Sequence, residues 1–408
     1  MRLLLLLAAI VSLSSCSFFK EKVEEPEDLT SYSKNLIVKE RWKRSVGVGL
    51  GELYQLVKPA ISIDSVFAND IAGRIYAFDR KTGKEKWQNH LKVDLSSGVG
   101  LGVSVVLVGS LDGDVIALNQ SDGKELWRTN IASEILAPPQ TNEDIVVVQT
   151  NEGKLYGLDA STGKFLWRYT AKLPLLTLRG TATPQLFGNN LITGFANGKI
   201  VAISAKDGVL YWERRIAYPQ GQTQIERVVD VDGNPVISGQ TVYATSFNGS
   251  LTAIAPNGRL RWTQKISSYQ SPLVMDGRVF VTAADGSLHA YDAETGLPLW
   301  DNSLLLYRKL SAPQNLSGFV VVSDYRGYVH IFDPELGVIV GRSRFDKEGI
   351  RSPMISDGTY LYALGNDGEL SSISVHLRGS LEQINKQNEI EREKAREQKE
   401  INIPINTP

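Results

Sequence analysis

Short stretches of alternating hydrophobic and polar residues recur about every forty residues along this chain, and most of them end in tryptophan. The phrase GRIYAFDRKTGKEKW is typical: a glycine opens a strand, a D-x-x-T-G-K turn follows, and a second strand ends at Trp87. Aspartate and glycine suit hairpin loops of four or five residues. Copies of the phrase begin at Gly73, Gly113, Gly153, Gly198, Gly249, Gly286, Gly327 and Gly368.

Each copy follows another pair of apolar segments with a turn between them, as in PLVMDGRVFVTAAD from Pro272. One unit therefore comprises four short antiparallel strands. Repeats of 40–45 residues with four strands each are typical of propeller blades. The pattern predicts an all-β fold, an eight-bladed β-propeller of four-stranded antiparallel blades.

Trp42 lies upstream of the repeats, yet an apolar residue, Val46, follows it by four positions, as after most of the other tryptophans. We interpret it as part of the outermost strand of the eighth unit, whose own copy at Gly368 ends without a tryptophan. The N-terminal strand would then close the ring and leave no unpaired edge between the first and last blades. The tryptophans are expected to pack each blade on its neighbour rather than to stack on a ligand.

The first residues resemble a secretory signal followed by a bacterial lipobox. Arg2 precedes an apolar run that is too short to span a bilayer, and the sequence LSSC ends at Cys16, the single cysteine of the chain. We expect Cys16 to carry the lipid and to become the first residue of the mature protein. Ser17, in place of an aspartate, favours an outer-membrane anchor facing the periplasm.

The composition along the chain indicates four parts. The expected parts are a signal peptide at 1–15, a lipidated tether at 16–38, the propeller at 39–377 and a charged helical or disordered tail at 378–408. A formal net charge of −1 implies no basic surface for nucleic acid. With one cysteine the chain cannot form an internal disulfide, so the fold must rest on its core and on ring closure.

No catalytic, metal-binding or cofactor-binding pattern emerges. The four histidines fall at unrelated phases of the repeat: His90, His289, His330 and His376. Two glycine-rich runs, 47–51 and 98–102, do not open a helix after a strand, so they are not phosphate loops. The recurring aspartates are expected to cap turns rather than to bind calcium: Asp79, Asp159, Asp292 and Asp333. The sequence predicts neither an enzyme active site nor a cofactor.

Two connections between repeats are longer than those of the two preceding units. Trp167 and Trp212 are 45 residues apart and Trp212 and Trp262 are 50 apart, against 40 for the two preceding intervals. The first insert, 173–180, reads LPLLTLRG and is unusually apolar for a loop, whereas the second contains Asp-Val-Asp at 230–232. Long loops on a rigid scaffold often bind partners. The alternative is that the leucines pack on their own blade and the acids cap a turn.

The phrase A-x-D-x-x-T-G-x-x-x-W resembles the repeat of pyrroloquinoline-quinone dehydrogenases. Together with the lipobox, the eight units and the length, the chain from Met1 to about Leu377 resembles the BamB family, the lipoprotein propellers of the outer-membrane β-barrel assembly machine. The quinone enzymes carry a vicinal disulfide over the cofactor, which this chain cannot form. The resemblance implies a non-catalytic scaffold, a monomer within the Bam complex, that binds the POTRA domains of BamA and assists folding and insertion of unfolded outer-membrane β-barrel clients.

In that family an L-x-L-R-G loop and a nearby D-x-D loop form the BamA-binding surface. Together with Leu175 of the same insert, the partner surface would comprise Leu175, Leu176, Leu178, Arg179, Gly180, Asp230 and Asp232. Two other functions stay open at this point. One is a quinone-dependent dehydrogenase; the other is a periplasmic propeller for carbohydrate or cell-wall material, which would need aromatic residues beyond those of the repeat.

Overall fold

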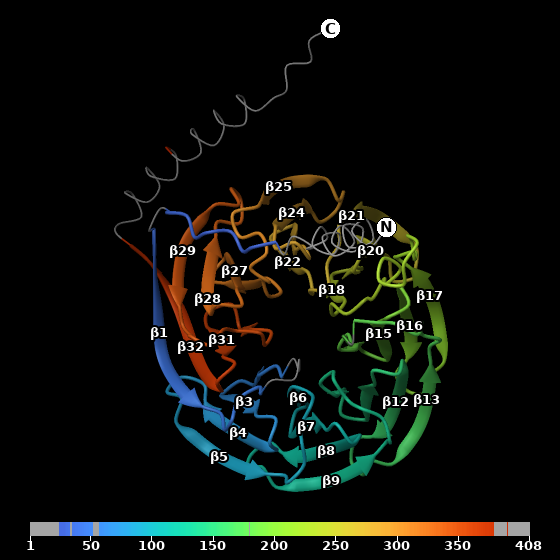
Figure 1. Cartoon of the computed structure of the whole chain (residues 1–408). Helices are drawn as coiled ribbons and strands as arrows, with labels where there is room; N and C mark the ends of the chain where they lie inside the picture. Colours follow the sequence, from blue (N-terminus) through green and yellow to red (C-terminus); the bar gives the residue numbers. More distant parts are fainter. Residues whose placement is uncertain (1–23, 33–34, 52–56, 179, 379–389, 391–408) are drawn as a thin grey trace, which may run out of the picture.

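The computed structural model describes residues 24–32, 35–51, 57–178, 180–378 and 390. Eight four-stranded antiparallel sheets surround a common axis as the blades of a propeller (Figure 1). The predicted fold class is confirmed. The expected signal peptide, Cys16 and nearly all of the expected tail lie outside the described residues. Within the described part of the chain, no helix is long and apolar enough to cross a membrane.

The first four blades follow one another along the chain, each from the axis outward (Figure 1). Blade 1 comprises β2 (Ala60–Ile61), β3 (Ser65–Asn69), β4 (Arg74–Asp79) and β5 (Glu85–His90). Blade 2 comprises β6 (Gly100–Leu101), β7 (Val105–Gly109), β8 (Asp114–Asn119) and β9 (Glu125–Asn130). Blade 3 comprises β10 (Gln140–Thr141), β11 (Ile145–Gln149), β12 (Lys154–Asp159) and β13 (Phe165–Thr170). Blade 4 comprises β14 (Gln185–Phe187), β15 (Asn190–Phe195), β16 (Lys199–Ser204) and β17 (Leu210–Arg215).

The remaining blades continue the same order until the last, which takes its outer strand from the N-terminus. Blade 5 comprises β18 (Val236–Ser238), β19 (Thr241–Thr245), β20 (Ser250–Ile254) and β21 (Leu260–Lys265). Blade 6 comprises β22 (Leu273–Met275), β23 (Arg278–Thr282), β24 (Leu288–Asp292) and β25 (Pro298–Asn302). Blade 7 comprises β26 (Gln314–Leu316), β27 (Phe319–Ser323), β28 (Tyr328–Phe332) and β29 (Ile339–Arg344). Blade 8 comprises β30 (Ile355–Ser356), β31 (Leu361–Leu364), β32 (Glu369–Leu377) and β1 (Leu36–Ser45).

The ring closes through β1, as the position of Trp42 predicts. This strand pairs antiparallel with β32, from Leu36 opposite Leu377 to Ser45 opposite Glu369, with an irregularity before Trp42. Blade 8 therefore joins the two ends of the propeller, and the first and last blades leave no open edge between them.

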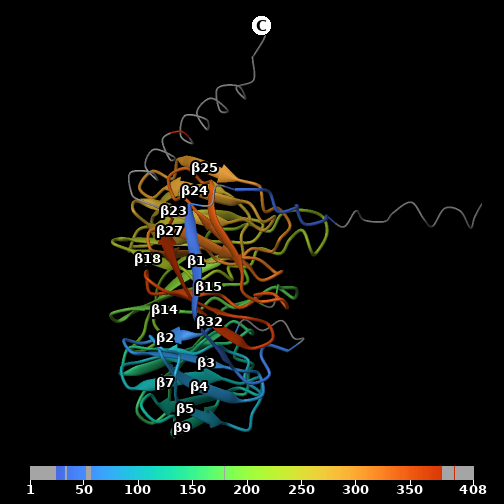
Figure 2. The ribbon, with the colours of Figure 1, turned by 90° about the vertical axis from the view of Figure 1, so that its left-hand side faces the viewer.

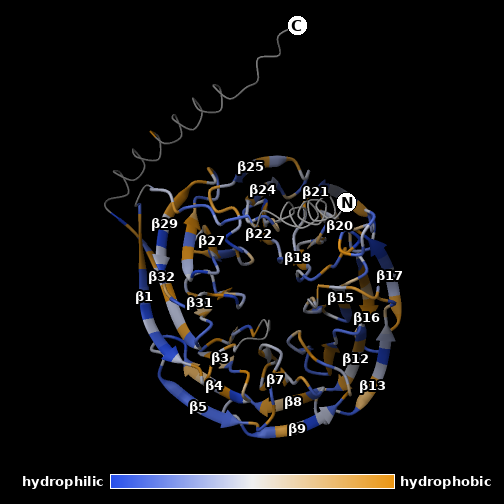
Figure 3. Ribbon diagram, viewed as in Figure 1, coloured by the Kyte–Doolittle hydropathy of each residue, from blue (hydrophilic) through white to orange (hydrophobic). Residues whose placement is uncertain are grey.

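Burial follows the position of a strand within its blade. The second and third strands are buried on both faces, and in Figure 3 they carry most of the hydrophobic colour, whereas outer strands such as β5 and β17 are mainly hydrophilic. The buried side chains form separate clusters between neighbouring blades rather than one central core. This division lets the fold repeat without a large single core.

Each tryptophan fastens its blade to the next one. Its indole nitrogen donates a hydrogen bond to a backbone carbonyl in the outer turn of the neighbouring blade, and the acceptors for the seven tryptophans in chain order are Arg80, Gln120, Ala160, Ala205, Pro256, Ala293 and Pro334. The ring lies on the turn glycine: a Cβ at Gly123 would come within 2.5 Å of Trp87, and this glycine has φ +70°. The predicted structural role of the tryptophans is confirmed.

The recurring aspartates cap the outer turns. Asp79 Oδ1 accepts hydrogen bonds from the backbone N–H of Lys81 and from the N–H and hydroxyl of Thr82, at 3.2, 2.9 and 2.7 Å. These donors favour the ionised carboxylate and hold the pKa of Asp79 below its usual value. Asp159 and Asp292 make the same bonds. The expected turn capping is confirmed.

The described part of the N-terminal segment, residues 24–32, lies against blade 7. Arg308 Nη1 donates to the Glu27 carbonyl at 3.0 Å, and Arg342 Nη1 donates to the Thr30 carbonyl at 2.9 Å. Two further residues of the segment pack on the core between blades 6 and 7: Leu29 and Tyr32. The segment therefore leaves the propeller at a defined place, although no sequence motif indicates these contacts.

A buried polar cluster holds the two arginines in position. Arg308 Nε donates to Asp324 Oδ2 at 2.7 Å, and Asp324 Oδ2 lies 3.0 Å from His330 Nε2. Arg342 Nε donates to His330 Nδ1 at 3.0 Å, so the neutral imidazole carries its proton on Nε2. Burial lowers the pKa of His330. His330 is therefore a packed strand residue with a fixed orientation.

Candidate partner-binding face

One face of the disc carries the connections between blades. Because strands alternate in direction within a blade, these connections emerge on the same face as the turns between second and third strands. We call it the insert face, and we define it by the two connections that contain the inserts, 171–184 and 216–235. In Figure 2 the yellow-green loop and the blue N-terminal segment project from the same side of the disc.

The leucines of the first insert divide into packed and exposed residues. Leu173 packs on the core between blades 3 and 4, as the alternative reading of the insert requires. In contrast, Leu175 is fully exposed, and Leu176 and Leu178 are 42% and 40% exposed. Three neighbouring apolar side chains on one exposed loop form a surface that a partner could cover.

The two inserts are joined by Asp230. Its carboxyl group is fully buried, and Oδ2 accepts a hydrogen bond from the backbone N–H of Leu178. A second link lies behind it, where the N–H of Thr183 donates to Asn234 Oδ1 at 2.6 Å. Asp230 therefore supports the leucine loop from inside, and its own carboxylate is buried.

Gly180 and Asp232 are in direct contact. A Cβ at Gly180 would lie 2.2 Å from the carboxyl carbon of Asp232, so the close approach of loop and carboxyl requires glycine. Arg179, the remaining residue of the expected partner surface, lies outside the described residues. The structure thus brings the L-x-L-R-G and D-x-D segments together, with leucines outward and carboxyls inward.

Burial changes the protonation of both acids. It raises the pKa of Asp230 to about 6, although the Leu178 N–H acts in the opposite direction. Burial and the neighbouring charge of Asp230 raise the pKa of Asp232 to about 8. The folded protein therefore holds protons that the unfolded chain has released between the ordinary pKa of 3.8 and these values.

We expect Asp232→Asn to raise the melting temperature, with a gain that grows from pH 5 to pH 8.5 and reaches several degrees. The sign follows from linkage: an acid whose pKa is higher in the folded state loses stability as the pH rises through that pKa. Thermal melts across this pH range measure the effect, with Asp276→Asn, an exposed turn aspartate, as control. An equal gain at every pH would show that Asp232 does not titrate as described.

The second insert contributes two apolar residues that the sequence analysis missed. Ile225 is 74% exposed and Tyr218 is 64% exposed. Ile225 sits in a turn fixed by reciprocal hydrogen bonds: Glu226 Oε2 accepts the N–H of Thr223 at 2.9 Å, and Thr223 Oγ1 accepts the N–H of Glu226 at 3.2 Å. The available signal was an isoleucine between the polar residues of QTQIER.

The insert face offers shape and apolar area rather than reactive groups. Among the residues that the structure describes, no three histidine, aspartate, glutamate or cysteine side chains gather as metal ligands would. The exposed large hydrophobic side chains of the two inserts are leucine, isoleucine and tyrosine, and they lie among exposed polar residues such as Lys172, Gln222 and Arg227. Such residues, held on a rigid scaffold, are suited to protein recognition.

Comparison with known proteins shows the family of this chain. Residues 72–302 match the family model described as outer membrane protein assembly factor BamB. A protein of that name from Pseudomonas aeruginosa is 48% identical over 371 residues, which cover 91% of this chain and 98% of the relative. This chain belongs to the BamB family.

Solved structures agree with this assignment. The crystal structure of BamB from Moraxella catarrhalis matches with a TM-score of 0.77 at 28% identity, covering 83% of this chain and all of that one. A quinohemoprotein alcohol dehydrogenase from Pseudomonas putida matches with a TM-score of 0.66 but only 14% identity, covering 84% of this chain and 77% of that one. The second likeness extends to the fold alone.

Proposed function

We propose that this protein is a non-catalytic, lipid-anchored scaffold of the Bam complex that assists the folding and insertion of outer-membrane β-barrel proteins. Membership of the BamB family supports the complex and the outer-membrane location. The main observation in favour of a protein contact is the exposed loop with Leu175, Leu176 and Leu178, which Asp230 supports from inside. We propose that this loop, with Arg179 beside it, binds POTRA domains of BamA.

The structure of the loop supports a protein partner over a small ligand. Leu176 and Leu178 are exposed on a connection between blades, and the loop is linked to the neighbouring insert by the buried Asp230. A loop that is already held in place loses little conformational freedom on binding, which favours affinity. The hydrogen bonds of the tryptophans between blades support a structural role for these rings rather than a role in binding sugar.

A pull-down tests membership of the complex. The protein carrying a C-terminal affinity tag would be isolated from detergent-solubilised envelopes, with a variant in which Leu176 and Leu178 are replaced by alanine beside it. We expect a POTRA-bearing barrel protein to copurify with the parent and to be depleted with the variant. Copurification that is equal for both would place the contact elsewhere, and its absence from both would contradict the scaffold proposal.

We expect Cys16→Ala to release the protein from the outer membrane without unfolding it. The thiol is the acylation site of the expected lipobox, and the propeller begins with β1 at Leu36, well after this position. Membrane fractionation and mass spectrometry of the N-terminal peptide measure the two expectations. A parent protein that stays in the membrane fraction without an acyl chain would contradict the anchor.

A further inference from the structure

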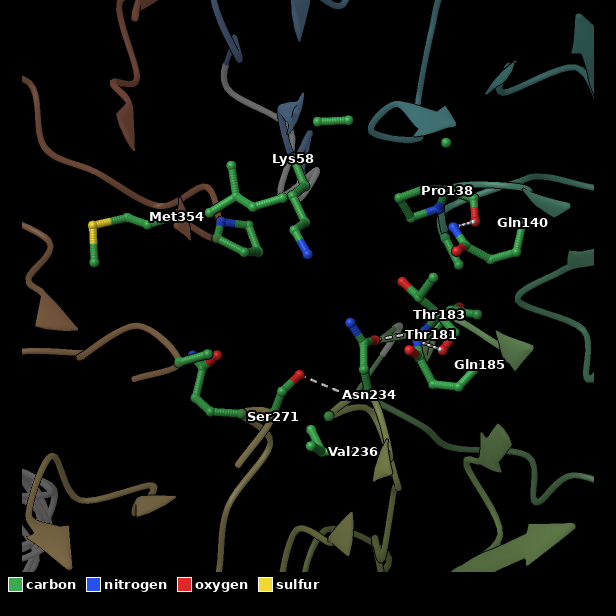
Figure 4. A pocket seen from close by; sticks show the side chains of 18 of the residues that line it. Lys58, Pro138, Gln140, Thr181, Thr183, Gln185, Asn234, Val236, Ser271 and Met354 are labelled. Carbon is green, nitrogen blue, oxygen red and sulfur yellow. Dashed lines mark hydrogen bonds between the residues drawn. The ribbon is translucent and has the colours of Figure 1, made fainter. Parts of the chain in front are cut away.

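A cavity of about 440 Å³ lies on the propeller axis (Figure 4), and the exposed leucines of the insert are not among the residues that line it. The innermost strands of all eight blades, or the connections leading into them, contribute to its wall. Its size falls in the range of about 300–1,000 Å³ that is usual for sites of small ligands. The side chains of its wall decide which class of ligand it can bind.

Glutamines at the start of three inner strands face the cavity but use their amide nitrogens elsewhere. Gln140 Nε2 donates to the carbonyls of Pro138 and Pro139 at 3.1 Å, and Gln185 Nε2 donates to the carbonyl of Thr183 at 2.9 Å. A third, Gln314, repeats the pattern toward its preceding proline. The amide nitrogens of Gln140 and Gln185 each make two such bonds, so these two glutamines have little donor capacity left for a ligand.

Lys58 supplies a first donor to the cavity. Its ammonium group points into the cavity (Figure 4), and no carboxylate of a described residue lies within ion-pair distance of it. Burial alone lowers the pKa of Lys58. Its backbone is tightly held, because the Lys58 carbonyl accepts the N–H of Val99 at 3.0 Å and a Cβ at Gly98 would lie 2.4 Å from the Lys58 nitrogen.

Asn234 supplies the second donor from the opposite side. Its Oδ1 accepts the N–H of Thr183, which turns the amide nitrogen toward the open space that Lys58 also faces (Figure 4). Among the described residues that line the cavity, Lys58 has the only cationic side chain and Asp232 the only carboxyl group. With its pKa raised to about 8, Asp232 is largely protonated at neutral pH and adds little negative charge.

Lys58 is partly buried, and a charge that is withdrawn from water without a partner lowers stability, so proteins rarely keep one unless a counter-charge joins it. Here a cation and a neutral N–H donor converge on a space large enough for a solute, an arrangement suited to charge-assisted binding of an oxyanion. We propose that the axial cavity binds a small solute through a carboxylate or phosphate group, with Lys58 as the ionic donor and Asn234 as the neutral donor. The exposed leucines of the proposed partner loop do not line this cavity, although Thr183, Asp232 and Asn234 of the same two connections do.

Calorimetric titration of the soluble Cys16→Ala chain at pH 7 and low salt tests the site, with citrate and inorganic phosphate as the two probes. Binding of either one supports the proposal and tells whether carboxylate or phosphate is preferred. Lys58→Met should weaken binding at least about tenfold, the loss expected when a charged hydrogen bond is removed. Lys164→Met, which removes an exposed turn lysine, provides the matched control and should bind as the parent does.

Asn234→Asp gives an independent check, because it keeps the acceptor for the Thr183 N–H while replacing the donor by a carboxyl oxygen. It should also lose the anion. Thermal melts accompany each titration, and Lys58→Met should melt no lower than the parent because it removes a charge without a partner. Absence of saturable binding of both probes, or parental affinity in a folded Lys58→Met, would overturn the proposal.

Discussion

Deleting β1, residues 36–45, should destabilise the whole propeller. The deletion removes Trp42, which packs 5.9 Å from the ring of Tyr362 and 6.4 Å from that of Phe78, and it leaves β32 as an open edge. Truncating a buried tryptophan alone costs about 3–5 kcal/mol, a large share of the about 5–15 kcal/mol that stabilises a typical protein. Thermal and denaturant melts followed by tryptophan fluorescence measure the loss.

Two single substitutions separate ring closure from packing. Trp42→Ala and Trp300→Ala each remove one indole with its hydrogen bond to the next blade, at 3.1 and 2.9 Å. They should cost similar amounts, because both rings are buried to the same degree. The β1 deletion should cost clearly more than either. A deletion variant that melts with Trp300→Ala would show that pairing between β1 and β32 contributes little.

The fold could be predicted from sequence because its determinants are local and repeated. An opening glycine, a capping aspartate, a turn glycine and a closing tryptophan occupy about fifteen residues, and each has the same task in nearly every blade. The position of β1 also followed, since Trp42 carries the same signal outside the repeats.

Contacts between distant segments could not be predicted in this way. Arg342 binds the carbonyl of Thr30 across more than three hundred residues, and no local pattern marks either partner. The same holds for the amide of Leu178 and the carboxyl of Asp230, which the family resemblance placed in one surface without showing that Asp230 is buried. Backbone carbonyls accept hydrogen bonds and backbone amides donate them whatever side chain the residue carries. Such bonds therefore cannot be predicted from the residue types.

The axial cavity shows a second reason why some features could not be predicted from the sequence. Its wall is built by inner strands of only two or three residues, such as β2 and β14, which are too short for a hydrophobic period to identify. Lys58 stands just before one of these strands and reads as an ordinary surface lysine. Only the assembly of eight blades around one axis places its ammonium inside the protein.

Replacing Leu176 and Leu178 together by alanine should weaken binding to a POTRA fragment of BamA at least about thirtyfold, because truncating interface anchors typically costs about 2 kcal/mol or more and about 1.4 kcal/mol is a factor of ten. The melting temperature should change little, since both side chains are substantially exposed in the free protein. A matched control replaces Leu297 and Leu299, two leucines of blade 6 that are exposed to a similar extent. On the resemblance, Arg179→Ala should act in the same direction.

Calorimetric titration of the POTRA fragment into the parent, the Leu176/Leu178 variant and the Leu297/Leu299 variant, with a thermal melt of each, tests the central claim most directly. The claim is that the leucine loop of the insert face binds the barrel-forming subunit. It predicts parental affinity for the Leu297/Leu299 variant and at least about thirtyfold weaker binding for the folded Leu176/Leu178 variant. Equal affinity in all three proteins would contradict it.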